Sequence, residues 1–480
     1  MRVNNLYDVL IIGAGVIGAS IARELSKYNL KVIVIEKEND VCEGTSCANS
    51  AIIHSGYDPE PGSLKAKLNV LGNQMYDKIC EDLSVSFIRN GSITVANDEN
   101  ELEIIDSLIE RANLNGVPVQ KLNKAELKAI EPNISDTVLG GLLAPTAGII
   151  NPFELNVALM ENAMDNGVEL KLKEKVINIE LVNNIFKVYT ENDCYETKFV
   201  INAAGVYTDE INQMVNEQYF TIKARKGDYF ILDHFDDNFI KHTLFNVPTD
   251  KGKGVLVAPT THYNYLVGPS SEFVEDKEST RCDFDTLNNI KNQAKNLVDY
   301  IDYSKQIRQF SGLRSVSSTK DFLIDQPIKG FVNVAGIQSP GLSAAPAIAL
   351  MVCDFIENKE LKENFISIRR PFIKMNNMTI SERNDLIKQN PAFGKLICRC
   401  EKISEGEIVD AIHRNCGATT VKGVKKRVRA GFGKCQGGFC EVEVMKILAR
   451  ELNCDLSDIE YSRRGSFVVK EPLYKEVKHD

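Results

Sequence analysis

The first 35 residues contain two short apolar runs on either side of an amphipathic stretch. Apolar, largely β-branched residues fill 7–12 and 31–35, and apolar positions recur at helical spacing over 19–29. Short apolar runs next to glycine are typical of buried strands, and the stretch between them has the length and period of a helix. The pattern therefore predicts one βαβ unit, the repeating element of a parallel sheet.

Later runs predict how the remainder of the chain is organised. Four of them are predicted to add strands to the same parallel sheet, which makes its domain discontinuous: 169–172, 176–179, 198–203 and 331–335. Residues 219–327 instead alternate apolar and polar positions between Gly, Pro and Asn, which predicts an antiparallel sheet. The polar stretch 358–394 is interpreted as a connector, 395–454 as a small cysteine-bearing domain, and 455–480 as a tail.

Composition and charge narrow the class of protein. The 480 residues are 43% apolar and 26% charged, as in ordinary globular chains, and three times the usual domain length predicts several domains. A net charge of −9 argues against nucleic acid as the main partner. There is no apolar stretch long enough to span a membrane, and twelve cysteines are too few for a secreted disulfide framework. We therefore expect a cytoplasmic protein whose clustered thiols bind metal.

A glycine motif follows the first predicted strand. Gly13, Gly15 and Gly18 form GxGxxG, and Glu36 ends the second predicted strand. In this context the first glycine makes a tight turn, the second lets the backbone approach a pyrophosphate, and the third allows close packing of helix on strand. The helix N-terminus attracts the phosphate charge, and the acidic residue binds a ribose. The motif predicts a dinucleotide site without separating FAD from NAD, and a glycine turn without a ligand is the alternative.

The segment 43–56 separates the two cofactors, because it resembles the flavin-contacting segment of the FAD-dependent glycerol-3-phosphate and D-amino-acid oxidase superfamily. Over 1–357 the resemblance is closest to bacterial glycerol-3-phosphate oxidases and dehydrogenases, and five separate blocks carry it in order: 49–72, 225–230, 247–260, 265–271 and 336–348. It implies an α/β fold with a discontinuous, Rossmann-like FAD-binding domain and an antiparallel-sheet substrate domain. The FAD-binding segments are then about 1–75, 150–218 and 328–357, and the substrate domain is about 76–149 and 219–327.

The same resemblance implies which residues contact FAD. They are Gly13, Gly15, Val16, Ile17, Gly18, Glu36, Thr45, Ser46, Ser50, Ala51, Ile52, Val176, Ala204, Gly205, Ile337, Gln338, Gly341, Leu342 and Ser343. The last three open a predicted helix, whose N-terminal donors would stabilise the negative charge of a reduced flavin. A side-chain helix cap by Ser343 is the alternative interpretation.

His54 is the expected catalytic base, because oxidation of a secondary alcohol requires a group that removes the hydroxyl proton near neutral pH. It lies inside the flavin-contacting segment, whereas the other five histidines lie in polar loops, a helix or the tail. A buried structural histidine, or one attached covalently to the flavin, remains the alternative. Arg314 and Lys253 match the anion-binding positions of the family, and Ser50 and Ser339 match its polar contacts. These matches favour glycerol 3-phosphate as substrate, with L-2-hydroxyglutarate as the nearest rival.

Four cysteines near the C-terminus form two close pairs, Cys398 with Cys400 and Cys435 with Cys440. Four thiolates hold an iron–sulfur cluster, and paired spacing places two sulfurs at each iron. Residues 395–452 resemble the bacterioferritin-associated-ferredoxin-like [2Fe-2S] domain that ends the large subunit of anaerobic glycerol-3-phosphate dehydrogenases. A zinc site is the alternative. Six basic residues between 422 and 434 are interpreted as a solvated helix face, and docking of an acidic partner is a second hypothesis for them.

The combined resemblance implies a dehydrogenase in which FAD accepts a hydride and a [2Fe-2S] cluster passes single electrons to protein subunits. An oxidase would gain nothing obvious from an attached cluster, so an acceptor other than oxygen is expected. An electron carrier without a substrate of its own is the alternative class. We expect no nucleic acid partner and no direct membrane insertion, so that any membrane association would come through partner subunits.

Overall fold

The computed structural model describes residues 6–235, 239–248 and 254–470. These residues fold into two compact units. Of the described residues, the first unit comprises those within 6–36 and 41–369, and the second comprises 37–40 and 370–470. The mixed α/β class predicted from the sequence is confirmed.

A parallel sheet lies at the centre of the first unit. The predicted βαβ unit is present as β1 (Tyr7–Ile12), α1 (Val16–Leu25) and β2 (Val32–Ile35). Three more strands run parallel to it: β9 (Glu169–Lys171) beside β2, β12 (Cys194–Asn202) beside β1, and β20 (Phe331–Ala335) beside β12. All residues of β2 and β20 are buried, which explains why these strands are continuous apolar runs.

One predicted strand joins this sheet through an antiparallel neighbour. Residues 176–179 belong to β10 (Val176–Val182), which pairs antiparallel with β11 (Ile185–Thr190), and β11 pairs antiparallel with β12. Strand β10 therefore runs in the same direction as β1, as expected, but has no parallel partner among the described strands. Asn183 and Asn184 join the two strands with φ of 51° and 62°. Two consecutive left-handed residues make the tight turn that matches the twist of a hairpin. A further antiparallel strand, β19 (Leu323–Ile328), pairs with β20 at the other side.

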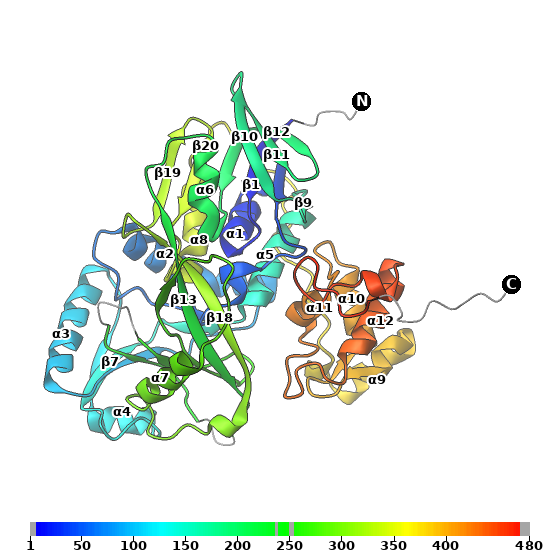
Figure 1. The fold of residues 1–480 in the computed structure, drawn as a ribbon. Helices are drawn as coiled ribbons and strands as arrows, with labels where there is room; N and C mark the ends of the chain where they lie inside the picture. The colour runs from blue at the N-terminus through cyan, green and yellow to red at the C-terminus, as the bar shows by residue number, and fades with distance from the viewer. Residues whose placement is uncertain (1–5, 236–238, 249–253, 471–480) are drawn as a thin grey trace. The chain divides into compact units, whose positions relative to one another are not determined.

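Four helices pack together beside the parallel sheet. Helix α1 packs against α5 (Pro152–Asp165) and α8 (Gly341–Cys353), and α8 also packs against α2 (Leu64–Leu83), as Figure 1 shows. The start of α5 has a strong sequence signal, because the Asn151 side chain accepts hydrogen bonds from two backbone N–H groups and Pro152 occupies the first turn.

The second sheet joins strands from two distant segments of the first unit. Its strand order in the described residues is β17 (Glu272–Val274), β13 (Ile222–Leu232), β16 (Tyr265–Gly268), β15 (Leu256–Pro259), β14 (Thr243–Asn246), β5 (Ser92–Ala96), β7 (Gly140–Ala144) and β6 (Gln120–Asn123). The long strand β18 (Gln306–Ser317) pairs antiparallel along the whole of β13. Only the β14 and β5 pair is parallel in this described sheet.

Helices and a small sheet complete this part of the first unit. The helices are α3 (Glu99–Leu114), α4 (Lys124–Ile130), α6 (Thr208–Gln213) and α7 (Phe284–Ala294). The three-stranded sheet consists of β3 (Ile52–Ile53), β8 (Gly148–Ile150) and β4 (Phe87–Ile88). Strand β3 lies between the residues predicted to contact the flavin and His54, so this sheet fixes the position of that segment.

The second unit is a small helical domain with a short hairpin. Its elements are α9 (Ile380–Gln389), β21 (Leu396–Cys398), β22 (Ile403–Ser404), α10 (Glu405–Ile412), α11 (Val421–Val428) and α12 (Glu441–Leu452). Residues 370–394, which composition suggested as a connector, contain α9 and fold with this unit. Phe372 packs into its core with residues of α10, α11 and α12.

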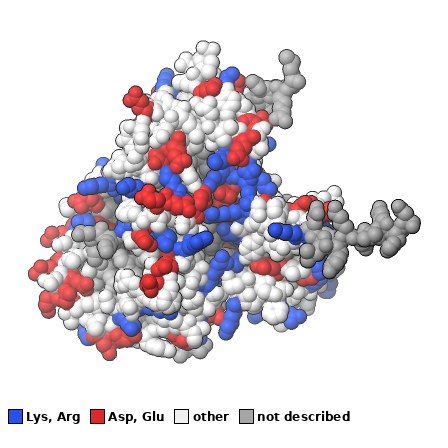
Figure 2. All heavy atoms as spheres, in the orientation of Figure 1, with Lys and Arg blue, Asp and Glu red and all other residues white. Residues whose placement is uncertain are grey.

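The surface carries charges of both signs. Acidic and basic side chains are interspersed over the face shown in Figure 2. Within the described ranges, no helix has both the length and the apolar character needed to cross a bilayer. With a net charge of −9, this chain must bind an anion through a local group of cations rather than through a broad positive field.

Candidate active site and iron–sulfur site

The glycine motif forms a tightly packed turn at the carboxyl end of β1. Gly13 has φ of 103°, and a side chain there would lie 2.7 Å from the carbonyl oxygen of Ala203. A side chain at Gly18 would lie 1.9 Å from the Gly13 carbonyl oxygen. Only glycine fits at these two positions, so the end of β1 approaches the end of β12 and α1 packs closely on the sheet.

The surroundings of this turn fit a dinucleotide. Glu36, at the end of β2, accepts a hydrogen bond of 2.7 Å from the Ala14 backbone N–H. The backbone N–H of Val16, the first residue of α1, donates a hydrogen bond of 2.9 Å to Ser46 Oγ. Because β1, β2 and β12 are parallel neighbours, their carboxyl ends place the glycine turn, Glu36 and 203–205 at one edge, where ligands bind in such sheets. Val176, also predicted to contact FAD, lies buried at the start of β10.

The segment that resembles a flavin contact is fixed against strand β18. Thr45 donates a hydrogen bond of 2.5 Å to the Leu313 carbonyl oxygen. A side chain at Gly312 would lie 2.0 Å from the Ala48 carbonyl oxygen, so glycine permits this close approach. Ser50 Oγ lies 2.8 Å from the hydroxyl of Tyr229 on β13. The segment 45–50 therefore contacts α1, beside the parallel sheet, through Ser46, and it contacts the second sheet through Thr45 and Ser50.

Buried polar side chains fix the backbone of His54. Its N–H donates 2.7 Å to Ser343 Oγ, and its carbonyl oxygen accepts from the amides of Asn69 at 3.2 Å and Asn73 at 3.0 Å. These three side chains are between 0% and 4% exposed. The imidazole ring lies 5.9 Å from the Phe245 ring, and its Nε2 is 3.5 Å from Ser339 Oγ. The sequence-predicted base and Ser339 are thus neighbours, with the imidazole edge turned toward Ser339.

The start of α8 differs from the cap that its sequence suggested. Pro340 is the N-cap and no side chain caps the helix, so the interpretation of Ser343 as a capping residue was wrong. The Ser343 hydroxyl accepts the His54 N–H instead. Pro346 lacks the N–H that would bond the Leu342 carbonyl oxygen, and the Tyr76 hydroxyl donates to that oxygen. The first turn of α8 therefore supports His54 through the Ser343 side chain, and Tyr76 satisfies the carbonyl group that Pro346 leaves unpaired.

Two arginines lie directly opposite each other on β13 and β18. Arg225 and Arg314 are register partners, which places their side chains on one face of the sheet. Arg314 Nη2 donates 2.7 Å to the Ser270 carbonyl oxygen, and Arg225 Nε donates 2.6 Å to Ser271 Oγ. Burial, and then the charge of Arg314, lower the pKa of Arg225. A guanidinium group can donate two parallel hydrogen bonds to a phosphate or carboxylate, so these two arginines are candidates for binding an anion.

Sequence reasoning selected Arg314 but missed Arg225 and Tyr229. In a strand, residues two apart share a face, so Arg225, Gly227 and Tyr229 point the same way. A side chain at Gly227 would lie 2.9 Å from Arg314 Nη2, so the glycine makes room for that guanidinium. This period within the block 225–230 could have revealed both residues. Lys253, the other predicted cation, lies outside the described residues.

The other described histidines lie elsewhere. His242 Nδ1 lies 2.7 Å from the buried carboxylate of Glu131, His413 Nε2 lies 2.5 Å from the Glu451 carboxylate, and His234 Nδ1 lies 2.9 Å from the Asp233 carboxylate. His262 lies 3.0 Å from Thr261. His479 is outside the described residues. Of the described histidines, His54 is therefore the one that lies in the flavin-contact segment, and its ring is next to Ser339.

The four predicted cluster cysteines lie in two facing loops. Cys400 Sγ is 3.6 Å from Cys435 Sγ, and a hydrogen bond from the Cys440 thiol lowers the pKa of Cys398 to about 6. A side chain at Gly433 would lie 2.3 Å from Cys400 Cβ, so glycine allows the loops to meet. In the described part of the chain, no three metal-ligating side chains gather at one point. Four thiols in two pairs match a [2Fe-2S] cluster, in which each iron takes two of them.

The basic run beside the second cysteine pair is not a solvated helix face. Lys425, Lys426 and Arg427 are buried, so that expectation was wrong. Asp40 accepts two hydrogen bonds of 2.9 Å from Arg427 and pairs with Lys426 at 3.0 Å. Burial opposes ionisation, but the two cations hold the pKa of Asp40 well below its usual range. Arg427 is therefore a structural ion-pair residue, which also removes it from the hypothesis of partner docking.

Together the fold and these sites define a flavin-dependent oxidoreductase with an attached iron–sulfur domain. The family model described as FAD dependent oxidoreductase matches residues 8–355, and the BFD-like [2Fe-2S] binding domain matches 396–450. The chain belongs to the FAD-dependent oxidoreductase family and carries a [2Fe-2S]-binding domain.

Its relatives include proteins with and without the second domain. A glycerol 3-phosphate dehydrogenase of Caloramator mitchellensis is 48% identical over 98% of this chain and 100% of its own length. A glycerol 3-phosphate oxidase of Mycoplasma genitalium is 35% identical over 74% of this chain and 96% of its own. The solved L-α-glycerophosphate oxidase of Mycoplasma pneumoniae with FAD bound superposes with a TM-score of 0.74 at 32% identity, covering 77% of this chain and all of its own.

Proposed function

We propose that this protein oxidises sn-glycerol 3-phosphate to dihydroxyacetone phosphate and passes the electrons to an acceptor other than oxygen. The observations that carry the proposal are a histidine, His54, whose backbone is held by buried hydrogen bonds, and two arginines opposite each other on strands of the sheet that also bears Tyr229, the partner of Ser50. The Caloramator relative named for this activity matches both domains, which adds support.

His54 removes the proton of the substrate hydroxyl in this proposal. FAD, when bound, supplies the acceptor for the hydride that leaves the same carbon. The hydrogen bonds to the His54 backbone hold the ring in place, and Ser339 orients the Nε2 edge. A base with a pKa near neutral and a fixed position contributes about 10²–10⁴ to the rate. We expect His54→Gln to lower kcat by that factor while FAD content, measured by absorbance, stays unchanged.

Arg314 and Arg225 hold the substrate phosphate, together with Lys253. A phosphate monoester carries nearly two negative charges and three acceptor oxygens, which one guanidinium cannot satisfy. The Tyr229 hydroxyl, on the same face of β13 as Arg225, and its partner Ser50 add polar groups to this proposed site. L-2-hydroxyglutarate also bears two charges, so the choice between these substrates needs a direct measurement.

The second unit carries the electrons away. A [2Fe-2S] cluster, when held by Cys398, Cys400, Cys435 and Cys440, exchanges electrons one at a time. Cys400 is exposed, and Phe439, which precedes Cys440 in the chain, is 85% exposed, so both cysteine segments have residues accessible to another protein. Arg399, Lys402 and Lys434 are exposed near the same edge and make no ion pair within the described residues. We assign the electron acceptor to a protein subunit that docks here.

An anaerobic titration tests the proposed activity. Glycerol 3-phosphate should bleach the oxidised flavin absorbance at a stoichiometric ratio, while glycerol, which lacks the phosphate, should not. L-2-hydroxyglutarate and simple L-amino acids serve as comparison substrates under the same conditions. Faster bleaching by L-2-hydroxyglutarate would identify that compound, rather than glycerol 3-phosphate, as the substrate. No bleaching by any of these compounds would indicate an electron carrier. In air, turnover with an artificial acceptor should exceed peroxide formation, and rapid peroxide formation would indicate an oxidase.

A further inference from the structure

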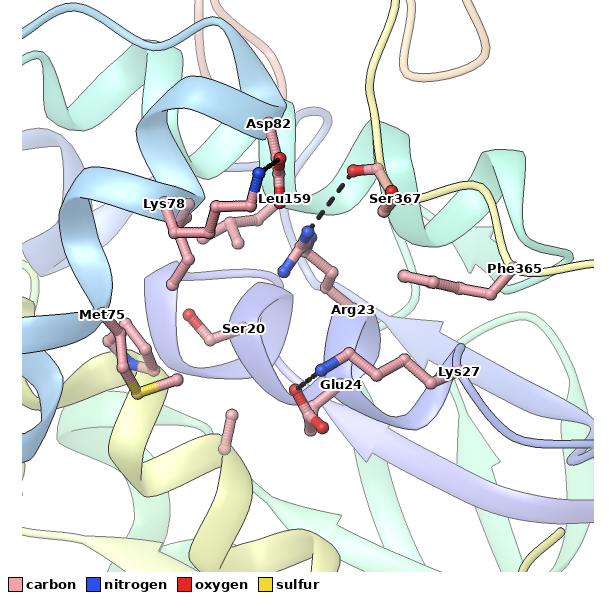
Figure 3. Close-up of a pocket in the computed structure, with 13 residues that line it drawn as sticks. Ser20, Arg23, Glu24, Lys27, Met75, Lys78, Asp82, Leu159, Phe365 and Ser367 are labelled. Carbon is pink, nitrogen blue, oxygen red and sulfur yellow. Dashed lines mark hydrogen bonds and ion pairs between the residues drawn. The ribbon is translucent and has the colours of Figure 1, made fainter. Parts of the chain in front are cut away.

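A cavity of about 330 Å³ lies between helices α1, α2, α5 and α8 of the first unit (Figure 3). We call it the Arg23 cavity. Its size is at the lower end of the range found for pockets that bind small molecules. Its apolar walls are Met75, Ile79, Leu159, Pro346, Ala349 and Phe365.

Arg23 brings a buried positive charge to this cavity. The residue is only 8% exposed, and burial lowers its pKa. Its Nε donates 2.9 Å to Asn162 Oδ1, and its Nη2 lies 3.5 Å from the Ser367 carbonyl oxygen. No carboxylate of the described residues forms an ion pair with it. A buried cation with neutral partners is stabilised by an anion.

The nearby carboxylates are already engaged by other cations. Glu24 pairs with Lys27 at 2.7 Å, and Asp82 pairs with Lys78 at 2.8 Å, as the dashed lines in Figure 3 show. Both pairs lie on the cavity wall and leave the guanidinium of Arg23 between them. Among the described residues that line the cavity, Arg23 is thus the cation that makes no ion pair, and the charges of Glu24 and Asp82 act on it without a direct contact.

Ser20 provides a second, independent sign of a ligand. It is 4% exposed, and its hydroxyl has no hydrogen-bond partner in the described parts of the chain. Residues three apart on a helix share a face, so Ser20 and Arg23 line the cavity from the same side of α1. Buried hydroxyl groups normally have a partner, and a missing one marks a site for a water or a ligand. An anion bound by Arg23 would also accept from Ser20.

The Arg23 cavity is separate from the dinucleotide site. The N-terminus of α1, at Gly15, adjoins the glycine turn, whereas Arg23 lies in its last turn. At 1.5 Å per residue, the eight residue steps from Gly15 to Arg23 span about 12 Å. None of the residues of the cavity is among those expected to contact FAD or substrate.

We propose that the Arg23 cavity binds a small amphipathic carboxylate, such as a medium-chain fatty acid anion. The carboxylate lies between Arg23 and Ser20, and its chain lies against the apolar walls. A simple inorganic anion would leave those walls without contacts, and a neutral hydrocarbon would leave Arg23 and Ser20 without a partner. The cavity therefore selects for both parts of the ligand.

Calorimetry on the holoenzyme saturated with glycerol 3-phosphate tests this proposal, with octanoate as the probe. Octanoate should bind saturably, at least tenfold more tightly than acetate or octanol, which each lack one part of the ligand. Arg23→Gln and the milder Ser20→Ala should weaken binding at least tenfold and about threefold, respectively. Lys27→Gln, on the same helix but paired with Glu24, should retain the affinity.

Two outcomes would overturn the proposal: equal affinity for octanol and octanoate, or octanoate binding that Ser20→Ala and Arg23→Lys both leave unchanged. Both of these variants conserve the volume of the site and are chosen in case Arg23→Gln fails to fold. Because substrate saturates its own site throughout, failure here would not affect the proposed activity.

Discussion

Two pairs of basic residues in this protein have opposite surroundings. Arg225 and Arg314 donate to the neutral oxygens of Ser271 and Ser270, whereas Lys426 and Arg427 pair with the carboxylate of Asp40. These hydrogen bonds of the first pair are with uncharged groups, and the second pair is neutralised inside its own unit. Clustered basic residues in a sequence therefore do not indicate a binding site when the fold supplies their counter-ion.

The largest effect is expected from removal of that counter-ion. Asp40→Asn leaves Lys426 and Arg427 buried with no carboxylate between them, so the second unit should lose about 3–5 kcal/mol of unfolding free energy. Denaturant unfolding of the holoenzyme, followed by loss of cluster absorbance, measures this change. Asp385→Asn, at an exposed pair with Lys388, is the matched control and should change little. An equal loss in both variants would contradict a structural role for the Asp40 pair.

The same contact predicts how stability depends on pH. The pKa of Asp40 is lower in the folded protein than in the unfolded chain, so its contribution is complete above the unfolded value of about 4. The contribution is lost as the pH falls below that value. Wild type should therefore lose more stability on acidification below about pH 4 than Asp40→Asn does. Parallel curves for the two proteins would show that Asp40 is not an ionised partner.

Replacement of Arg314 should have the next largest effect, which is on the binding of substrate. A hydrogen bond to a charged group contributes about 1.5–3 kcal/mol, which corresponds to roughly a 10- to 150-fold change in binding. Arg314→Gln should raise KM for glycerol 3-phosphate within that range and change kcat much less, because His54 is untouched. Steady-state kinetics with an artificial acceptor measures both constants. A large fall in kcat at unchanged KM would place Arg314 outside the phosphate site.

The sequence predicted those parts of the molecule whose signals are local. The βαβ unit, the glycine turn and the cysteine pairs each depend on residues within about one element of each other. Asn183 and Asn184 gave a local hairpin signal that was overlooked. The partner of Arg427, in contrast, is 387 residues away, so no spacing rule could reveal that the basic run is buried. The identification of Arg225 as a neighbour of Arg314 required the register of two strands that are distant in the sequence.

Arg225 provides a sharper test of the comparison, because its neighbour Lys223 is a matched control on the same strand. Lys223 shares the face of Arg225 but lies one pleat farther from Arg314 and is exposed. Arg225→Gln should raise KM for glycerol 3-phosphate about tenfold, in line with a single charged hydrogen bond. Lys223→Gln should change KM less than twofold. Equal effects of the two variants would indicate long-range attraction, which high salt would abolish in both.

The smallest effect is expected at the exposed cations near the cysteine pairs. Lys402 and Lys434 have no ion pair among the described residues and flank Cys400 and Cys435. If an acidic protein accepts electrons here, Lys402→Glu and Lys434→Glu should each slow its reduction a few-fold at low salt, because exposed charges mainly affect association. Reduction of a small neutral dye should stay unchanged. Lys446→Glu, on the exposed part of α12 and paired with Glu443, is the control. Unchanged rates in both cysteine-loop variants would move the docking surface away from this edge.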